Sequence, residues 1–297
     1  MPTFTSKIRK MPQKSLMGIL YFAAGMFLFA AVDTMAKVLT ESFHPLQVAW
    51  SRQLGLFIGI VILLVIKGTV ILKTDHFYLQ VLRGCLAAAS ALMFIFAISV
   101  VPIADAVAVS FVAPFFVTIL GALVLRESVG VRRWTAVIIG FIGVIFVINP
   151  QNLNFNILFI FPIIAAVFLT IRDITTKGIA TKSNSFEIIF ITSVLMTLFS
   201  GVGSLFFEFT FKLEYLPNLF ISSIFLTIAY IFSVLTIFYA PLSLTASSRY
   251  SVIVFGIIFG YFILDEVPSI NMLIGAAIIS FSGLFVIKRQ KDLGKIK

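Results

Sequence analysis

The chain has 297 residues, of which 60% are hydrophobic and only 11% are charged. Soluble domains carry roughly 25% charged residues, so this composition excludes a soluble globular protein and predicts one that crosses a membrane several times. A single cysteine, Cys85, excludes an intrachain disulfide and a cysteine metal cluster, while the net charge of +10 raises the question of a nucleic-acid partner.

Apolar runs along the chain predict ten transmembrane helices, because a helix needs about 20 mostly apolar residues to span a bilayer. In chain order we expect them over residues 16–38, 45–66, 79–99, 102–125, 131–148, 157–178, 186–207, 217–240, 241–264 and 270–287. Turn residues mark several of the short connections, such as Phe43-His44-Pro45 and Asp265-Glu266-Val267-Pro268.

The positions of lysine and arginine predict the orientation, because cytoplasmic loops are enriched in these residues. We place both termini in the cytoplasm, which leaves Lys212 as the only loop cation on the outer side. The cytoplasmic segments then hold fifteen of the 22 lysines and arginines: Lys7, Arg9, Lys10, Lys14, Lys67, Lys73, Arg126, Arg132, Arg133, Lys182, Lys288, Arg289, Lys291, Lys295 and Lys297. Topology therefore explains the basic excess, and no nucleic-acid partner is expected.

Two long segments of the sequence match each other without a gap. Residues 102–148 align with 241–287 at an offset of 139, and residues 32–37 align with 172–177 at an offset of 140. The matching turn and charged residues of the longer pair are Pro102 and Pro241, Gly121 and Gly260, and Glu127 and Glu266. Five helices per repeat force the second repeat to enter from the opposite side. The sequence therefore predicts an all-α integral membrane fold of two inverted five-helix repeats, 16–149 and 157–288.

Each repeat contains an L-x-E pattern followed by a glycine-rich helix. The patterns are Leu125-Arg126-Glu127 with Gly140 and Gly143, and Leu264-Asp265-Glu266 with Gly275 and Gly283. Together with the repeat and the topology, they resemble the EamA-type members of the drug/metabolite transporter superfamily over residues 16–288. The resemblance implies a ten-helix carrier for amino acids, nucleotide-like metabolites, vitamins or drugs. Within that superfamily, Leu82-Arg83-Gly84, Ser110-Phe111-Val112-Ala113-Pro114 and Ser248-Arg249-Tyr250 are similar to the branch that includes S-adenosylmethionine uptake carriers.

Charged residues inside the predicted spans mark candidate functional positions, because a charge at membrane depth costs about 2.5–3.5 kcal/mol and needs a cavity or a partner. Asp33 and Lys37 lie four residues apart, as do Asp173 and Lys177, so each pair is expected to form an ion pair on one helix face. Asp33 and Asp173 are also the candidates for binding a coupling proton.

Arg52 and Arg249 have no carboxylate four residues away on their own helix. We expect them, with Tyr250, to form the anion-selecting side of a central cavity, since a guanidinium is suited to carboxylate or phosphate. The structural alternative is an ion pair between Arg52 and Asp33. Arg83 is nearer the cytoplasmic end, where its side chain can extend to the surface, and it is retained as a candidate substrate-binding residue.

Aromatic, acidic and small residues complete the predicted site. Trp50 and Phe111 are candidates for stacking on the substrate. Glu127 and Glu266 are expected to cap helices or pair with basic residues. The small residues over 87–91 are expected to allow close helix packing.

The sequence predicts a secondary transporter of the inner membrane that moves a small organic metabolite bearing a carboxylate or phosphate by alternating access. Such a substrate is amino-acid-like or S-adenosylmethionine-like, and the expected partners are this metabolite, membrane lipid and, for coupling, protons. No cofactor or metal is expected, and monomer and homodimer both remain open. The alternatives are an exporter of drugs or amino acids with the same fold, or a membrane-embedded enzyme or receptor. An enzyme is disfavoured because His44 and His76 lie in loops on opposite sides and no catalytic motif accompanies them.

Overall fold

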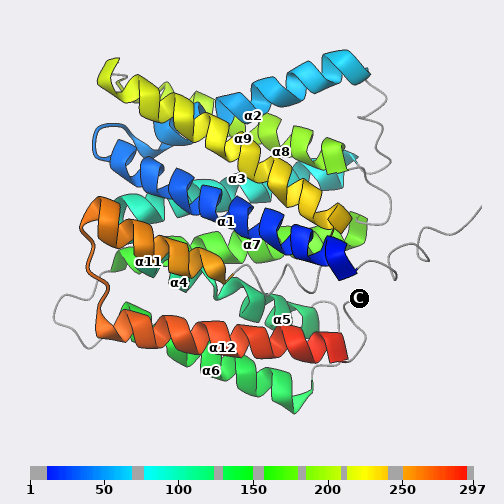
Figure 1. The fold of residues 1–297 in the computed structure, drawn as a ribbon, viewed down its shortest axis with the longest axis vertical. Coiled ribbons are helices and arrows are strands. Elements are labelled where there is room, and N and C mark those ends of the chain that lie inside the picture. Colours follow the sequence, from blue (N-terminus) through cyan, green and yellow to red (C-terminus); the bar gives the residue numbers. More distant parts are fainter. Residues whose placement is uncertain are drawn as a thin grey trace, which may run out of the picture.

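A computed structural model describes residues 12–68, 77–123, 130–149, 157–179, 185–208, 213–239 and 250–292. All regular elements within these ranges are helices, arranged roughly along one common direction (Figure 1). They are α1 (Pro12–Thr40), α2 (Pro45–Lys67), α3 (Phe77–Val100), α4 (Ile103–Ser110), α5 (Ala113–Leu123), α6 (Val131–Ile148), η3 (Ile157–Phe159), α7 (Ile160–Ile179), α8 (Ser185–Ser204), η4 (Leu213–Tyr215), α9 (Leu216–Tyr239), α11 (Ser251–Leu264) and α12 (Ile270–Asp292).

Seven segments of the described chain are long and apolar enough to cross a membrane. They are Leu20–Thr40, Pro45–Ile66, Phe77–Val100, Ile103–Leu123, Ile157–Thr176, Glu187–Ser204 and Leu216–Ser233, and three shorter apolar helices cover Trp134–Ile148, Ser251–Leu264 and Ile270–Phe285. The expectation of an all-helical membrane protein is confirmed. The count of ten spans stays a prediction, and residues 240–249, where the ninth span was expected to begin, lie outside the described residues.

The span expected over 102–125 corresponds to the apolar segment Ile103–Leu123, but this segment is divided into two helices, α4 and α5, joined at Phe111 and Val112. The backbone N–H of Phe111 bonds to the carbonyl of Ala108 at 3.2 Å, which is the tighter geometry of a helix end. Pro114, the second residue of α5, has no N–H, and its ring excludes the α-helical position of the Ser110 carbonyl. The proline therefore ends one helix and starts the next within a single apolar segment.

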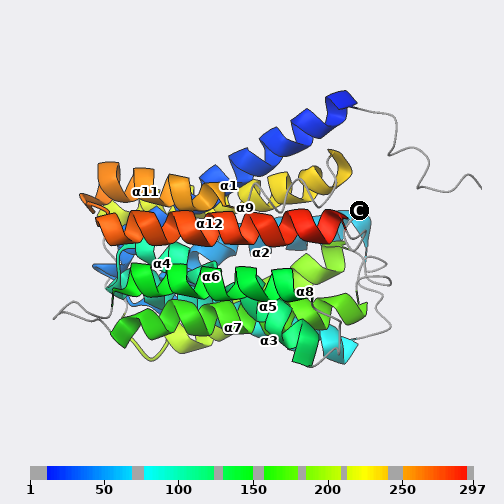
Figure 2. The same cartoon turned by 90° about the horizontal axis from the view of Figure 1, so that it is seen from below.

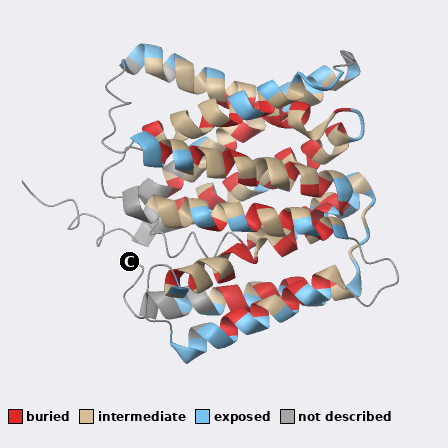
Figure 3. Cartoon of the chain, turned by 180° about the vertical axis from the view of Figure 1, so that it is seen from behind, coloured by how far each residue is buried: buried red, intermediate tan, exposed pale blue. Residues whose placement is uncertain are grey.

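The helices pack side by side around a buried centre. Figures 1 and 2 both show α6 and α12 next to each other at one edge, and Figure 1 shows α2 at the opposite edge. Figure 3 shows buried residues concentrated between the helices and exposed ones along the outer surfaces. Ile103 and Phe115 are fully buried near the α4–α5 break, with Met272 and Ile279 of α12 in the same cluster. Outward-facing apolar side chains such as Phe281, which is 75% exposed, suit contact with lipid.

Two glycines allow α6 and α12 to approach closely. A Cβ atom added at Gly275 would lie 2.5 Å from the carbonyl oxygen of Gly143 and 2.6 Å from Cγ2 of Val147. Any side chain there would separate the helices, so their contact depends on small residues, as is common in membrane proteins.

Candidate functional site

A cavity of about 340 Å³ lies among six of the long helices and the end of α4. Among the described residues, four charged side chains line it: Asp33 on α1, Arg52 on α2, Arg83 on α3 and Arg172 on α7. The remaining described lining residues are Phe29, Gln53, Leu56, Ala87, Ala88, Ser90, Ala91, Phe94, Ser110, Ala165, Ala166, Leu169, Ile188, Ile189, Thr192, Ser193, Met196, Leu226 and Tyr230. The wall is thus mostly apolar with a few polar groups, which is the usual composition of a small-molecule site.

Arg52 and Asp33 form an ion pair at the edge of this cavity. Nη1 of Arg52 donates to Oδ1 of Asp33 at 3.0 Å, and the two side chains are 9% and 20% exposed. The expected pair between Asp33 and Lys37 is therefore wrong, and the alternative contact between Asp33 and Arg52 is confirmed. Helix spacing along α1 placed Lys37 within reach of Asp33, but Asp33 pairs with Arg52 of α2 and Lys37 pairs with a residue beyond the end of α11.

Lys37 instead pairs with Glu266, in the connection between α11 and α12. The Nζ of Lys37 also donates to the carbonyl of Val101 at 2.6 Å, and Oε2 of Glu266 accepts the backbone N–H of Ile103 at 2.8 Å. Glu266 therefore caps the first turn of α4 while it balances a lysine of α1. This confirms its expected role, with partners distant in sequence, and the equivalent Glu127 lies outside the described residues.

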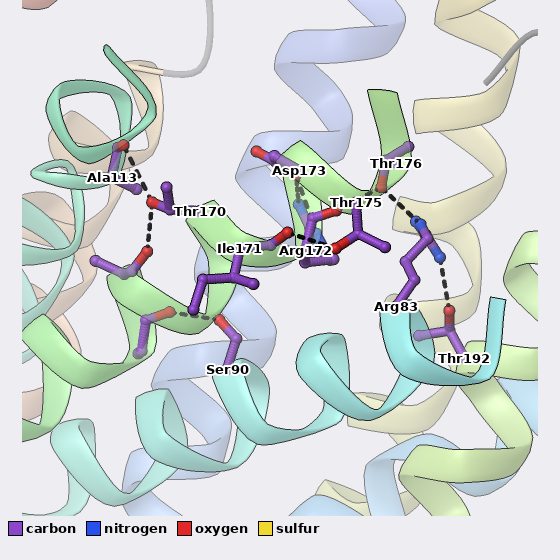
Figure 4. Close-up of polar contacts among 12 residues, drawn as sticks. Arg83, Ser90, Ala113, Thr170, Ile171, Arg172, Asp173, Thr175, Thr176 and Thr192 are labelled. Atoms are coloured by element: carbon purple, nitrogen blue, oxygen red, sulfur yellow. Dashed lines mark hydrogen bonds and ion pairs between the residues drawn. The ribbon is translucent and has the colours of Figure 1, made fainter. Parts of the chain in front are cut away.

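Arg83 lies near the start of α3 and Arg172 lies near the end of the neighbouring helix α7, within electrostatic range of each other (Figure 4). The Nε of Arg83 donates to Oγ1 of Thr176 at 2.9 Å, and its Nη1 donates to Oγ1 of Thr192 at 3.1 Å. Arg172 donates from Nε and Nη2 to Oδ1 of Asp173, at 3.1 and 2.7 Å. Asp173 is thus paired with its neighbour in the chain, while the side chain of its expected partner Lys177 lies outside the described residues.

The predicted aromatic residues lie around the cavity and are absent from its described lining. Trp50 packs on α8, where a Cβ added at Gly201 would lie 2.9 Å from its Nε1. Phe111 and Tyr250 contact each other at the α4–α5 break, with ring centroids 4.7 Å apart, and the hydroxyl of Tyr250 packs against Gly283 of α12. Arg249 lies outside the described residues.

Comparison with known proteins assigns the family. Residues 16–149 match the EamA-like transporter family. A riboflavin transporter of Brucella anthropi is 30% identical over 239 residues, which cover 78% of this chain and 84% of the relative. The chain belongs to the EamA-like transporter family. The resemblance to this branch of the drug/metabolite transporter superfamily is therefore confirmed, and the protein is a multi-pass membrane transporter.

Relatives of this EamA-like transporter have different cargoes and directions in their names. An S-adenosylmethionine uptake transporter of Rickettsia prowazekii is 28% identical over 276 residues, covering 93% of this chain and 94% of the relative. A pseudopaline exporter of Pseudomonas aeruginosa is 20% identical over 182 residues, covering 61% of this chain and 64% of the relative. A solved crystal structure superposes with a TM-score of 0.64 at 14% identity, over 94% of this chain and 99% of that chain, which shows a shared fold.

Several residues that line the cavity of the EamA-like transporter, or that bind its arginines, were not predicted as site residues from its sequence. Ala87, Ala88, Ser90 and Ala91 were taken as packing residues, yet they line the cavity, and their small size leaves room for it. The run of small residues was the available signal. Thr176, Thr192 and Tyr230 carried no such signal, because single hydroxyl residues are common in membrane helices and become significant only through their contacts.

Proposed function

We propose that this EamA-like transporter is a secondary transporter of the inner membrane that moves a small organic metabolite bearing a carboxylate or phosphate by alternating access. The observation that carries this proposal is the cavity lined by Arg52, Arg83 and Arg172 but by only one described carboxylate, that of Asp33. Guanidinium groups in a partly desolvated site favour an anionic group on the cargo. The amino-acid portion of S-adenosylmethionine has such a group, and a relative is named for uptake of that compound.

The helix contacts support the proposed arrangement of two inverted five-helix repeats, 16–149 and 157–288. The repeat relates α1, α2 and α3 to α7, α8 and α9, and relates α4 with α5 to α11. Under this exchange, the contact of α1 with α9 becomes that of α7 with α3, and the contact of α2 with α9 becomes that of α8 with α3. All of these contacts are present, as expected if two similar units pack around a pseudo-two-fold axis and rock about a central site.

The Lys37–Glu266 contact fits alternating access in the proposed orientation, which has both termini in the cytoplasm. In this orientation the contact lies on the outer side, where it ties α1 and the start of α4 to the α11–α12 connection. Outward opening between the repeats requires these segments to separate. The contact therefore suits a closed outer end in an inward-facing carrier.

The sequence contains no ATP-binding P-loop motif, so direct use of ATP is not proposed as the driving force of transport. We propose an ion gradient, exchange or the gradient of the substrate itself, with Asp33 and Asp173 as the candidate proton-binding residues. Their pairing with Arg52 and Arg172 makes protonation compete with an ion pair. Full retention of pH-gradient dependence in both Asp33→Asn and Asp173→Asn would exclude proton coupling through these residues.

Uptake and counterflow by the purified protein in liposomes test the proposal. The probes are S-adenosylmethionine, L-methionine, L-glutamate and riboflavin, and we expect saturable uptake of a carboxylate-bearing compound that accelerates when unlabelled compound is trapped inside. Such acceleration identifies a carrier, because an open channel gives none at equal concentrations. Transport of riboflavin alone would refute the proposed substrate class, and linear uptake without counterflow would refute alternating access.

A further inference from the structure

We propose that Arg83, held in position by Thr176 and Thr192, is the anion-binding residue of the cavity and recognises a single carboxylate of the cargo. This assignment rests on the proposed function and deepens it. The sequence predicted that Arg52 and Arg249 select the anion, whereas Arg83, also a candidate substrate-binding residue, was expected to extend toward the cytoplasmic surface.

The pattern of charge pairing distinguishes Arg83 from the other cavity arginines. Arg52 is balanced by Asp33 at 3.0 Å, and Arg172 is balanced by Asp173 at 2.7 Å. Within the described residues, Arg83 has no carboxylate at ion-pair distance. Among the described groups, Arg172, Asp173 and Tyr230 lie within electrostatic range of it, and Asp173 already accepts both bonds from Arg172. The described cavity therefore carries one unbalanced positive charge, which a single negative charge on a ligand would balance.

The hydrogen bonds of Arg83 orient its guanidinium without cancelling this charge. The hydroxyl of Thr192 donates its proton to the carbonyl of Ile188 at 2.8 Å, and the hydroxyl of Thr176 donates to the carbonyl of Arg172 at 2.7 Å. Each hydroxyl oxygen is thus left to accept a bond from Arg83, as observed at 3.1 and 2.9 Å. Both acceptors are neutral, so they fix the position of a charge that remains available.

The free edge of the guanidinium can bind a carboxylate. The two threonines take hydrogen bonds from Nε and Nη1, and no hydrogen bond of Nη2 is found among the described residues, while Arg83 lines the cavity. The remaining N–H groups of Nη1 and Nη2 form the planar fork that binds a carboxylate through two parallel bonds. Thr176 on α7 and Thr192 on α8 are then positioning residues that act through Arg83.

The alternative role for Arg83 is a structural bridge between α3 and helices α7 and α8. The two roles separate when ligands differ only at the carboxylate. The matched pairs are S-adenosylmethionine with its decarboxylated form, and L-methionine with L-methioninamide. Binding of each compound to the purified full-length protein is measured from its concentration-dependent shift of the unfolding temperature, for the wild type, Arg83→Gln, Arg83→Lys, Thr192→Val and the control Thr192→Ser.

We expect the wild type to bind the carboxylate member of a pair about 10- to 100-fold more tightly than its partner, as one charge-assisted interaction provides. Arg83→Gln should reduce this ratio to about one while the affinity for the carboxylate-free member stays unchanged. Arg83→Lys should retain part of the ratio, because it keeps the charge and loses the fork. Thr192→Val should lower the ratio, and Thr192→Ser should restore it.

Equal weakening of both members of a pair by Arg83→Gln would overturn the assignment and leave Arg83 a structural residue. If Arg83→Gln does not fold, the double variant Thr176→Val and Thr192→Val decides, because it keeps the charge; an unchanged ratio would then overturn the assignment. Failure of the wild type to bind either carboxylate compound would instead refute the carboxylate class in the proposed function, and this assignment with it.

Discussion

Removal of Asp33 should destabilise the protein more than removal of Asp33 and Arg52 together. Asp33→Asn leaves the Arg52 charge, only 9% exposed, without its partner, and the Nε of Arg52 is already buried without an acceptor among the described residues. Breaking a buried pair costs about 3–5 kcal/mol. Because Asp33 is 20% exposed to the cavity, we expect the low end, about 3 kcal/mol. The double variant Asp33→Asn with Arg52→Gln has no stranded charge and should lie within about 1 kcal/mol of the wild type.

The assay is thermal unfolding of the detergent-purified protein, followed by tryptophan fluorescence. At about 2 °C per kcal/mol for a chain of this size, Asp33→Asn should lower the unfolding temperature by about 6 °C and the double variant by about 2 °C. The control is Asp173→Asn, since the Arg172–Asp173 pair is 25% and 38% exposed and should contribute less than about 1 kcal/mol. Arg52→Gln alone is measured as well. If the double variant were destabilised by the sum of the effects of Asp33→Asn and Arg52→Gln, or if Asp33→Asn were as stable as Asp173→Asn, this reasoning would be refuted.

Three further predictions test the helix packing, a helix cap and the outer contact. Gly275→Ala should destabilise by about 1–3 kcal/mol through its clash with α6, whereas Gly59→Ala, with open space at its Cβ position, should be neutral; equal thermal stability of the two would contradict this. Burial lowers the pKa of His44, whose neutral ring accepts the Leu46 N–H at 3.3 Å. Because the folded state then binds a proton less readily than the unfolded state, the stability that is present above about pH 6.5 should fall as the pH drops to 5. His44→Asn keeps a cap acceptor and should lose this extra acid sensitivity; an unchanged pH profile of unfolding temperature would argue against it. Glu266→Gln keeps an acceptor for the N–H of α4 but removes the ion pair with Lys37. If this lowers the stability of the closed outer end by about 1.4 kcal/mol, labelling from outside of a cysteine introduced into the cavity should rise about tenfold. Unchanged labelling would show that the contact does not hold the outer end closed.

The sequence predicted the helices better than their interruptions and contacts. Composition and hydropathy determine which segments enter a bilayer, so seven of the expected spans overlap the seven long apolar segments of the described chain. The α4–α5 break was missed because an apolar run does not show where its hydrogen bonds stop. Pro114 was the local signal, since a proline has no N–H and its ring excludes the helical carbonyl four residues earlier, so it is tolerated only in the first turn of a helix.

The charged residues show why a site is harder to predict than a span. Spacing along one helix suggested that Asp33 and Lys37 pair, but such a pair contributes only about 0.2–0.5 kcal/mol at a helix surface. Packing brings Arg52 to one residue and Glu266 to the other, in less exposed positions where each contact is stronger. The acids and bases within the membrane were identifiable from the sequence, whereas their pairing depends on which helices become neighbours.

The division of one apolar segment into α4 and α5 has a consequence for biogenesis. At 1.5 Å per residue, the eight residues of α4 rise about 12 Å and the eleven of α5 about 16 Å, so neither alone crosses a hydrocarbon core of about 30 Å. The insertion machinery must therefore receive Ile103–Leu123 as one unit, before the chain that stabilises the break has been synthesised. In the mature fold the hydroxyl of Thr170, on α7, lies between two acceptors, the carbonyl of Ala166 in its own helix at 2.7 Å and the carbonyl of Ala113 at 3.2 Å. Part of the segment's final shape thus depends on a helix that leaves the ribosome later.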